Sequence, residues 1–260
     1  MNFIKKIKKQ INYSFAIKNK PPTAVAIETN SICNRSCEYC PVSIEKREKG
    51  EMSRELFIKI INGLDDLKFN GLLTFHHFNE PLIDKRLPSL IKYARSVLID
   101  AHIRIVSNGD LINEDSILDL FHSGISELRI SGHDEKASSR IEKLISNYNG
   151  DYKDKIFFQR FYDGSMEMSN WGGTIKLSEK YDKLMSHPSG GCKYGQQLTI
   201  NYKGESVICC RDYFSEGKIG DYKKNTVKEI WNNSSKVRKN ISLGNYEFDI
   251  CKNCNVPQSS

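Results

Sequence analysis

The chain of 260 residues has no apolar stretch close to the ~20 residues that a membrane-spanning helix needs. Its N-terminal segment also lacks the continuous apolar region of a secretory signal, because lysines interrupt the apolar residues Phe3, Ile4, Ile7 and Ile11. We therefore expect a cytoplasmic protein without a transmembrane segment. Residues 1–23 are predicted to form a basic helix docked on its own domain, with a helix touching a membrane surface as the alternative.

No run of basic residues alternates with aromatic ones, although the formal net charge is +7. Such runs are typical of nucleic-acid-binding surfaces, whereas scattered lysines indicate a solvated basic surface, so we expect no nucleic-acid partner. Repeats and low-complexity segments are missing too. The length and the 38% hydrophobic content suit one large domain, or one domain with a small extension.

Cysteine is absent from the whole middle of the chain, because none occurs between Cys40 and Cys192. A disulfide framework is typical of short secreted chains with dispersed cysteines. Clustered cysteines in a long chain instead indicate reduced thiols kept for metal. The first group is Cys33, Cys37 and Cys40, and the second is Cys192, Cys209, Cys210, Cys251 and Cys254.

The apolar pattern predicts alternating strands and helices up to about residue 165. Because this alternation repeats, we expect an α/β fold with parallel strands and right-handed helical crossovers. Sites in such sheets and barrels form at the carboxyl ends of the strands. Strands are predicted over 24–30, 71–78, 102–108, 126–131 and 155–162, and helices over 86–98, 114–124 and 135–148, with a further helix starting after Ser53.

The chain changes character after residue 165. Residues 198–210 predict a β-hairpin that turns at Lys203-Gly204, and residues 226–241 predict a helix. The segment ends near a C-x2-C pair formed by Cys251 and Cys254.

The first group, "CNRSCEYC", has only three cysteines, spaced C-x3-C-x2-C. A structural zinc site and a 4Fe–4S cluster each normally take four protein ligands. Three thiolates leave one iron of such a cluster without a protein ligand. That open position can bind another molecule, as a catalytic metal site requires. A zinc loop or a chance cluster remains the alternative.

This loop, placed after the first strand, resembles the signature of the radical S-adenosylmethionine (SAM) enzymes, and the resemblance covers roughly residues 24–165. It implies a partial (β/α)6 TIM-like barrel with a 4Fe–4S cluster on Cys33, Cys37 and Cys40. In the family, SAM chelates the unique iron, and one electron, from a donor such as flavodoxin or ferredoxin, cleaves its S–C5′ bond. The resulting 5′-deoxyadenosyl radical abstracts a substrate hydrogen.

The same resemblance implies residues that contact SAM. "FNEP", with Phe78, Asn79 and Glu80, is similar to the family's Gly-Gly-Glu segment beside the SAM amino group, although both glycines are replaced. "SNG" and "RISG" are similar to segments near the methionine and the ribose. Tyr39 stands where the family has an aromatic residue beside adenine. The residues implied by "SNG" and "RISG" are Ser107, Asn108 and Ser131.

The second cysteine group resembles the start of the SPASM pattern, and its shortness suggests the truncated Twitch form with one auxiliary 4Fe–4S cluster. The implied ligands are Cys192, Cys209 or Cys210, Cys251 and Cys254. Because adjacent strand residues face opposite sides, both middle cysteines should not ligate together, and the spacing from Gly204 favours Cys209. A four-thiolate zinc site is the alternative. The expected division is a radical SAM core over 24–185 and an auxiliary domain over 186–260.

The cysteine layout is similar to that of Twitch-bearing aminocyclitol dehydrogenases. We therefore expect oxidation of a secondary alcohol on a sugar, cyclitol or similar small molecule, with the auxiliary cluster as electron acceptor. "NWGG" resembles an Asn-Arg-Ala-Gly loop in which Trp171 replaces arginine. Alternatives are a radical SAM epimerase or peptide-modifying enzyme, and a zinc-binding nucleic-acid adaptor. Arg160 and Glu80 are the catalytic candidates, and other polar residues near strand ends are His76, His77, His133 and Gln159.

Overall fold

The computed structural model describes residues 20–44, 47–161, 169–176 and 191–255. Strands and helices alternate through the first part of this chain, as the sequence predicts. The strands are β1 (Ala24–Ile27), β2 (Leu72–Thr74), β3 (His102–Ser107), β4 (Glu127–Gly132), β5 (Ile156–Arg160), β6 (Gln197–Ile200), β7 (Glu205–Val207) and β8 (Lys218–Asp221). The α-helices are α2 (Arg54–Asp66), α3 (Leu87–Val97), α4 (Glu114–His122), α5 (Glu135–Asn147), α7 (Val227–Asn233), α8 (Ser235–Ser242) and α9 (Asp249–Lys252). Short 3-10 helices are η1 (Pro41–Ser43), η2 (Pro81–Ile83), η3 (Lys153–Lys155), η4 (Trp171–Gly173) and η5 (Lys193–Gln196).

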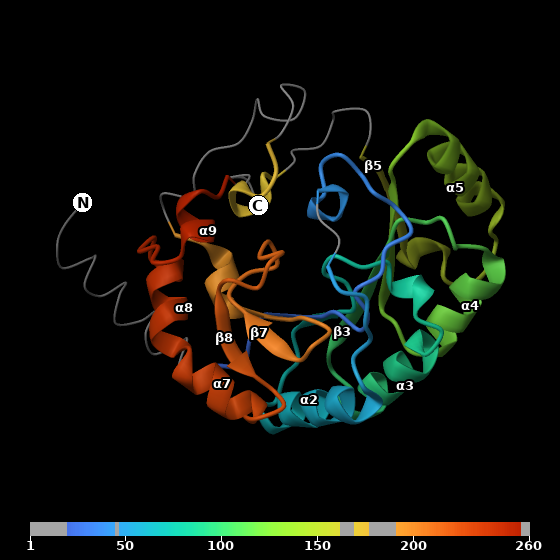
Figure 1. The fold of residues 1–260 in the computed structure, drawn as a ribbon. Coiled ribbons are helices and arrows are strands. Elements are labelled where there is room, and N and C mark those ends of the chain that lie inside the picture. Colours follow the sequence, from blue (N-terminus) through green and yellow to red (C-terminus); the bar gives the residue numbers. More distant parts are fainter. Residues whose placement is uncertain (1–19, 45–46, 162–168, 177–190, 256–260) are drawn as a thin grey trace, which may run out of the picture.

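The strands form one sheet in the order β5-β4-β3-β2-β1-β6-β7-β8. Strands β1 to β5 pair in parallel, and β6 pairs in parallel with β1 on its other side. The helices lie along the outer side of this curved sheet (Figure 1). Because neighbouring strands run the same way, their carboxyl ends and the loops that follow them gather at one edge.

The helices begin where side chains satisfy their first backbone N–H groups. The Ser53 hydroxyl accepts the Leu56 N–H at the start of α2, and Asp134 accepts the Ala137 N–H at the start of α5. Helix α4 has a reciprocal capping box between Asn113 and Ser116. One apolar core joins these helices to the sheet, with α2 contributing Leu56, Phe57, Ile60, Ile61 and Leu64.

The C-terminal segment shares the sheet with the first part of the chain. Strand β6 pairs with β1 from Ala24 opposite Gln197 to Ile27 opposite Ile200. The predicted hairpin is present as antiparallel β6 and β7, and Gly204 in its turn has a φ of 80°, in the region that favours glycine. The second cysteine group is therefore attached to the central strand of the fold.

Two predicted elements differ clearly from the observed ones, and one observed strand was not predicted. Strand β2 stops at Thr74 rather than at residue 78, because its pairing ends there, with Thr74 opposite Ala26 of β1 and Arg104 of β3. The predicted helix 226–241 is two helices divided at Ser234, whose hydroxyl donates to the Ile230 carbonyl, a contact that tends to bend helices. Strand β8 was not predicted. The predicted N-terminal helix lies outside the described residues, apart from residues 20–23.

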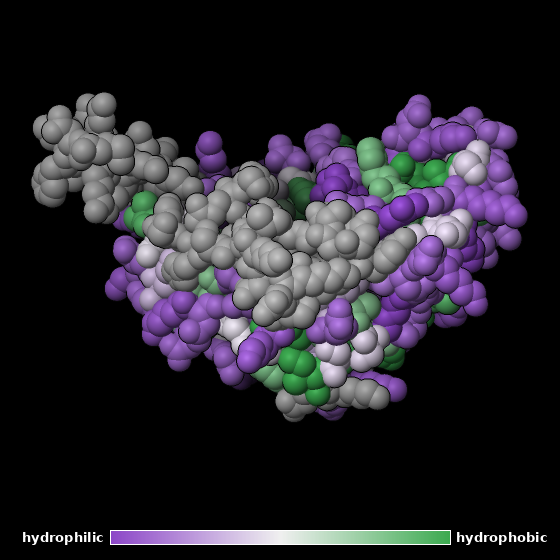
Figure 2. Space-filling model, turned by 90° about the horizontal axis from the view of Figure 1, so that it is seen from above, coloured by the Kyte–Doolittle hydropathy of each residue, from purple (hydrophilic) through white to green (hydrophobic). Residues whose placement is uncertain are grey.

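The described surface is mostly hydrophilic when the molecule is seen from above (Figure 2). No helix of the described part is both long and apolar enough to cross a membrane. Exposed large hydrophobic residues lie on different elements of the fold, and they are Ile44, Ile99, Leu111, Leu118, Phe157 and Phe214.

Candidate functional site

The three cysteines of the first group lie in the loop after β1, at the carboxyl edge of the sheet. All three are half-buried, and the Cys40 N–H donates to the Cys37 carbonyl at 2.9 Å. Burial raises the pKa of each thiol, and for Cys40 it raises the pKa to about 11. These thiols are therefore expected to stay neutral until a metal binds, when they lose their protons. Three soft ligands in one loop fit a cluster with an open iron.

Glu80 ties the ends of β1, β2 and β3 together from a buried position. Its carboxylate accepts the Ser107 hydroxyl at 2.8 Å and the Asn108 N–H at 2.7 Å. It also accepts the Leu82 N–H, while the Glu80 N–H donates to the Ile32 carbonyl. Burial raises the pKa of Glu80, although the hydrogen bonds that its carboxylate accepts act in the opposite direction. Its carboxylate is thus engaged in holding the strand ends, and its catalytic assignment stays a prediction.

Asn108 connects the end of β3 to the cysteine loop. Its side-chain amide donates to the Asn34 side chain at 2.7 Å and lies 3.9 Å from the Cys33 sulfur. The turn that follows needs Gly109, which has a φ of 78° and is so close to Ile141 that a Cβ would stand 2.5 Å from that side chain. The predicted "SNG" segment therefore lies directly beside the first cysteine.

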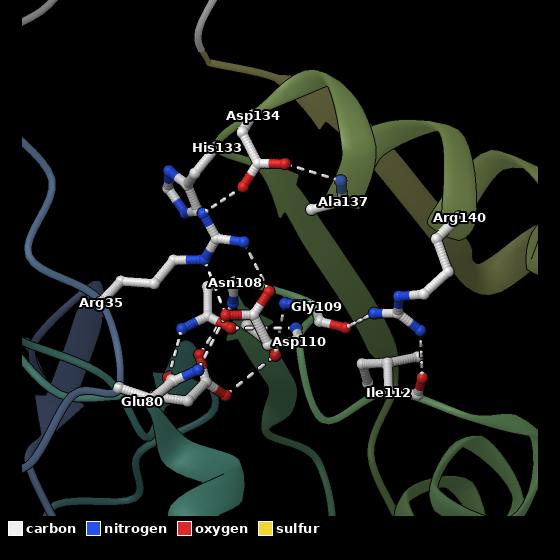
Figure 3. A network of polar contacts seen from close by, with 12 residues as sticks. Arg35, Glu80, Asn108, Gly109, Asp110, Ile112, His133, Asp134, Ala137 and Arg140 are labelled. Carbon is white, nitrogen blue, oxygen red and sulfur yellow. Dashed lines mark hydrogen bonds and ion pairs between the residues drawn. The ribbon is translucent and has the colours of Figure 1, made fainter.

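Arg35, inside the cysteine loop, is bound to two other strand ends. Its guanidinium donates to both carboxylate oxygens of Asp110 after β3, at 2.5 and 2.7 Å, and to Asp134 after β4 at 2.7 Å (Figure 3). Asp134 also caps α5. The Asp110 and Asp134 carboxylates raise the pKa of Arg35, so it stays charged. The role of Arg35 was not predicted from the sequence, although it lies between Cys33 and Cys37 in the motif.

Tyr39 and His133 lie together next to the cysteine loop. The Tyr39 hydroxyl is 2.5 Å from His133 Nδ1, and the two rings stack with centroids 6.0 Å apart. Burial, together with the charge of Arg35, lowers the pKa of His133 to about 4, so its imidazole is neutral at pH 7. The Tyr39 carbonyl accepts the Trp171 indole N–H at 2.6 Å. The "NWGG" loop therefore contacts the segment between Cys37 and Cys40.

A buried ion pair lies at the end of β1. Arg47 donates to both carboxylate oxygens of Glu28, at 2.5 and 3.2 Å, and Glu28 also accepts the N–H groups of Phe78 and Tyr202. The Glu28 side chain is 0% exposed and that of Arg47 is 13% exposed. Loss of either partner would leave a buried charge, which typically costs about 3–5 kcal/mol. Neither residue was identified from the sequence.

Aromatic rings surround Arg47 and connect the two cysteine groups. Its guanidinium carbon lies 5.2 Å from the Phe78 ring centre and 4.8 Å from that of Tyr213. Phe78 packs in turn against Tyr213 at 4.8 Å and Trp171 at 5.3 Å. Because Tyr213 closely follows Cys210 in the chain, this cluster links the loop after the first cysteine group to the second group.

A cavity of about 230 Å³ lies beside the cysteine loop. Its lining within the described residues includes Arg35, Arg47, Lys49, Cys33 and Tyr213. Because Arg35 and Arg47 are each ion-paired with carboxylates, the cavity is polar rather than strongly cationic.

The second cysteine group surrounds a separate cavity. Cys192, Cys209, Cys251 and Cys254 line it, whereas Cys210 does not. Within the described ranges, no three Cys, His, Asp or Glu side chains meet at the spacing of a single metal ion. Four thiols around one cavity fit a four-iron cluster by donor chemistry. Cys209 is thus placed as the sequence analysis favoured, although its ligation stays a prediction.

The remaining predicted site residues lie at strand ends but not together. Ser131 is buried near the end of β4. Arg160, at the end of β5, is exposed and ion-paired with Glu142 of α5 at 2.6 Å. Asn79 turns back on its own segment, with its side-chain oxygen accepting the His77 N–H. Arg160 therefore lies on the rim, and its role in catalysis stays a prediction.

Comparison with known proteins links this geometry to one chemistry. Residues 192–255 match the SPASM model, described as an iron–sulfur cluster-binding domain. Over 236 residues the chain is 28% identical to the S-adenosyl-L-methionine-dependent 2-deoxy-scyllo-inosamine dehydrogenase of Niallia circulans, with 89% of this chain and 92% of that relative covered. The similarity therefore extends over most of both chains.

Solved structures give the same relationship. A crystal structure of BtrN in complex with AdoMet and 2-DOIA superposes with a TM-score of 0.79 at 26% identity, covering 91% of this chain and 94% of that one. A structure of anSMEcpe with bound AdoMet has a TM-score of 0.56 at 15% identity and covers 90% and 86%, so it supports the fold alone. The predicted α/β class with a parallel sheet is confirmed.

Replacing Arg35 with glutamine is expected to release iron from the first cysteine loop at least about tenfold faster. The loop would lose three charge-assisted hydrogen bonds, and about 1.4 kcal/mol suffices for this factor. The measurement is anaerobic iron release to a chelator. Arg54→Gln, which removes an exposed arginine of α2, is the matched control. Equal rates in the two variants would contradict the role of Arg35.

Proposed function

Because this chain is a radical SAM enzyme with a C-terminal SPASM-type domain, we propose that it oxidises a secondary alcohol of a cyclitol, sugar or similar small polar molecule. The observation that carries the proposal is similarity to a dehydrogenase over almost the whole chain, including the SPASM match over the second cysteine group. When bound, SAM supplies the 5′-deoxyadenosyl radical that removes the carbinol hydrogen, and an auxiliary cluster takes up the second electron.

Different residues at the carboxyl edge of the sheet would hold the first cluster and contact SAM. Cys33, Cys37 and Cys40 would hold the first cluster, and Arg35 would fix their loop against the ends of β3 and β4. Glu80 would orient Asn108 beside this loop. The SAM contacts that we propose come from the segments that carried the resemblance, namely Tyr39, Phe78, Asn79, Glu80, Ser107, Asn108 and Ser131.

The charges beside the cysteine loop do not select against an amine. Arg35 and Arg47 line the cavity there, but each is ion-paired with carboxylates, so their charges are largely balanced. Neutral, acidic and amino polyols are therefore all candidate substrates for this chain.

The electron for SAM cleavage would come from a small reduced carrier such as a flavodoxin or ferredoxin in the cytoplasm. The net charge of +7 supports docking of an acidic carrier, and the eight free cysteines fit a reducing compartment.

The test is anaerobic incubation of the two-cluster enzyme with SAM, dithionite and separate neutral, acidic and amino polyols. We expect ketone and 5′-deoxyadenosine to form together with at least one of these polyols, and hydrogen to move from its carbinol carbon into 5′-deoxyadenosine. Absence of ketone with every polyol would contradict the substrate class. An epimerised product with no ketone would contradict the dehydrogenase.

A further inference from the structure

Arg211 is a buried arginine at the edge of the second cysteine cavity. It follows Cys209 and Cys210 directly, and it lines the cavity together with Cys192, Cys251 and other residues. Its Nη1 atom is buried and has no hydrogen-bond partner within the described chain. An unpartnered guanidinium nitrogen is costly to bury, so this atom indicates that a partner is missing from the protein atoms alone.

The other side of the guanidinium is held firmly. Arg211 Nε donates to the Ser169 hydroxyl at 2.6 Å, and its guanidinium carbon lies 5.0 Å from the ring centre of Tyr194. Ser169 also accepts the Trp171 N–H, so it is fixed by the "NWGG" loop. Arg211 can therefore present Nη1 without searching among rotamers, and it would lose little conformational entropy on binding a partner there.

The charge of Arg211 also has no carboxylate partner in the described part of the chain. No ion pair joins it to an aspartate or glutamate among residues 20–44, 47–161, 169–176 and 191–255. A buried cation needs an anionic partner. Four thiolates around iron and sulfide carry net negative charge, and they would occupy the cavity that Arg211 lines.

We propose that Arg211 Nη1 donates a hydrogen bond to a sulfur of the auxiliary cluster and that its charge raises the reduction potential of that cluster. Reduction adds one negative charge, and a nearby buried cation stabilises the more negative state. The role of Arg211 in electron transfer rests on the proposed dehydrogenase function. After the substrate radical has lost its hydroxyl proton, it gives one electron to become a ketone, and the cluster gains that electron. A higher potential makes this transfer more favourable.

The experiment uses the full chain with Cys33, Cys37 and Cys40 changed to alanine, so that only the auxiliary cluster remains. Anaerobic redox titration followed by EPR gives its potential. We expect Arg211→Gln to lower the equilibrium constant for electron uptake at least tenfold, which is about 59 mV for a one-electron couple. Arg211→Lys keeps the charge and should recover part of the loss.

Lys193→Gln is the matched control, because it removes the same charge one residue from Cys192 but from an exposed side chain. Water screens exposed charges, so its shift should be much smaller. If Arg211→Gln shifts the potential no more than Lys193→Gln, the electrostatic role is overturned. This readout needs no substrate, so its failure is distinct from failure of the dehydrogenase proposal.

A second measurement avoids substitution at Arg211, in case that variant loses iron. Arginine labelled with 15N only in its guanidinium group is incorporated into the chain that holds the auxiliary cluster alone. Pulsed EPR of the reduced cluster should then show coupling to 15N that the unlabelled protein lacks. Absence of this coupling would overturn the hydrogen bond.

Discussion

Cys37→Ala is expected to lower the rate of 5′-deoxyadenosine formation at least about 1,000-fold, which corresponds to about 4 kcal/mol in the barrier. The loop after β1 supplies only three thiols, so the loss of one leaves two ligands for a cluster that already has an open iron. Iron content should fall from about eight to about four atoms per chain, because the second cysteine cavity is untouched. The measurements are iron analysis and chromatography of the SAM products.

Ser36→Ala is the control for this substitution. Ser36 lies next to Cys37 in the same loop, is exposed, and offers no thiol. We expect about eight irons and near-normal cleavage of SAM in this variant. Full cleavage activity in Cys37→Ala, or equal losses in both variants, would contradict the assignment of the first cluster to this loop.

The second large effect is a contrast between two adjacent residues. Cys209→Ala is expected to leave about four irons, and Cys210→Ala about eight, because only Cys209 lines the cavity with Cys192, Cys251 and Cys254. The Cys209 variant should still cleave SAM, since the first loop is separate, but it should form at least about 100-fold less ketone per 5′-deoxyadenosine. Without the auxiliary cluster the substrate radical has no acceptor for its second electron, and a loss of this size corresponds to about 2.7 kcal/mol.

Mössbauer spectra and the ratio of ketone to 5′-deoxyadenosine measure this contrast. The two variants serve as controls for each other, because they change the same residue type at neighbouring positions. If Cys210→Ala loses the second cluster and Cys209→Ala retains it, then Cys210 rather than Cys209 is the ligand. A different outcome would identify Cys210 as a hydrogen-atom donor and the enzyme as an epimerase. In that case the unchanged enzyme makes an epimerised product, whereas Cys210→Ala keeps both clusters and makes ketone instead.

The local pattern of the sequence was enough to predict most of the fold. Ser53 and Asp134 cap their helices through contacts within three residues, and Gly124 adopts a φ of 107° after α4 as a helix stop requires. Alternation of strand and helix then implied parallel pairing. Strand β2 was predicted too long, because its end is set by pairing with β1 and β3 rather than by its own apolar residues.

Candidate site residues could be identified from the sequence where they lie at neighbouring positions. The spacing of Cys33, Cys37 and Cys40 needs no other part of the chain, and the same holds for "SNG" with Gly109. Arg35, Arg47 and Arg211 were not predicted, because the role of each depends on a partner or cavity formed by residues distant in the sequence. Arg35 meets Asp110 and Asp134, Arg47 meets Glu28, and Arg211 faces the second cysteine cavity.

The sequence by itself determined the two groups of cysteines, the order of strands and helices up to about residue 165, and the edge of the sheet at which the first group lies. These features depend on spacing and periodicity over short segments. Only the tertiary structure decided that β6 pairs with β1, that Cys209 rather than Cys210 lines the second cavity, and that arginines stand beside both sites. Long-range pairing and charge placement depend on which distant segments pack together, and that is settled by the burial of the whole core rather than by any local pattern.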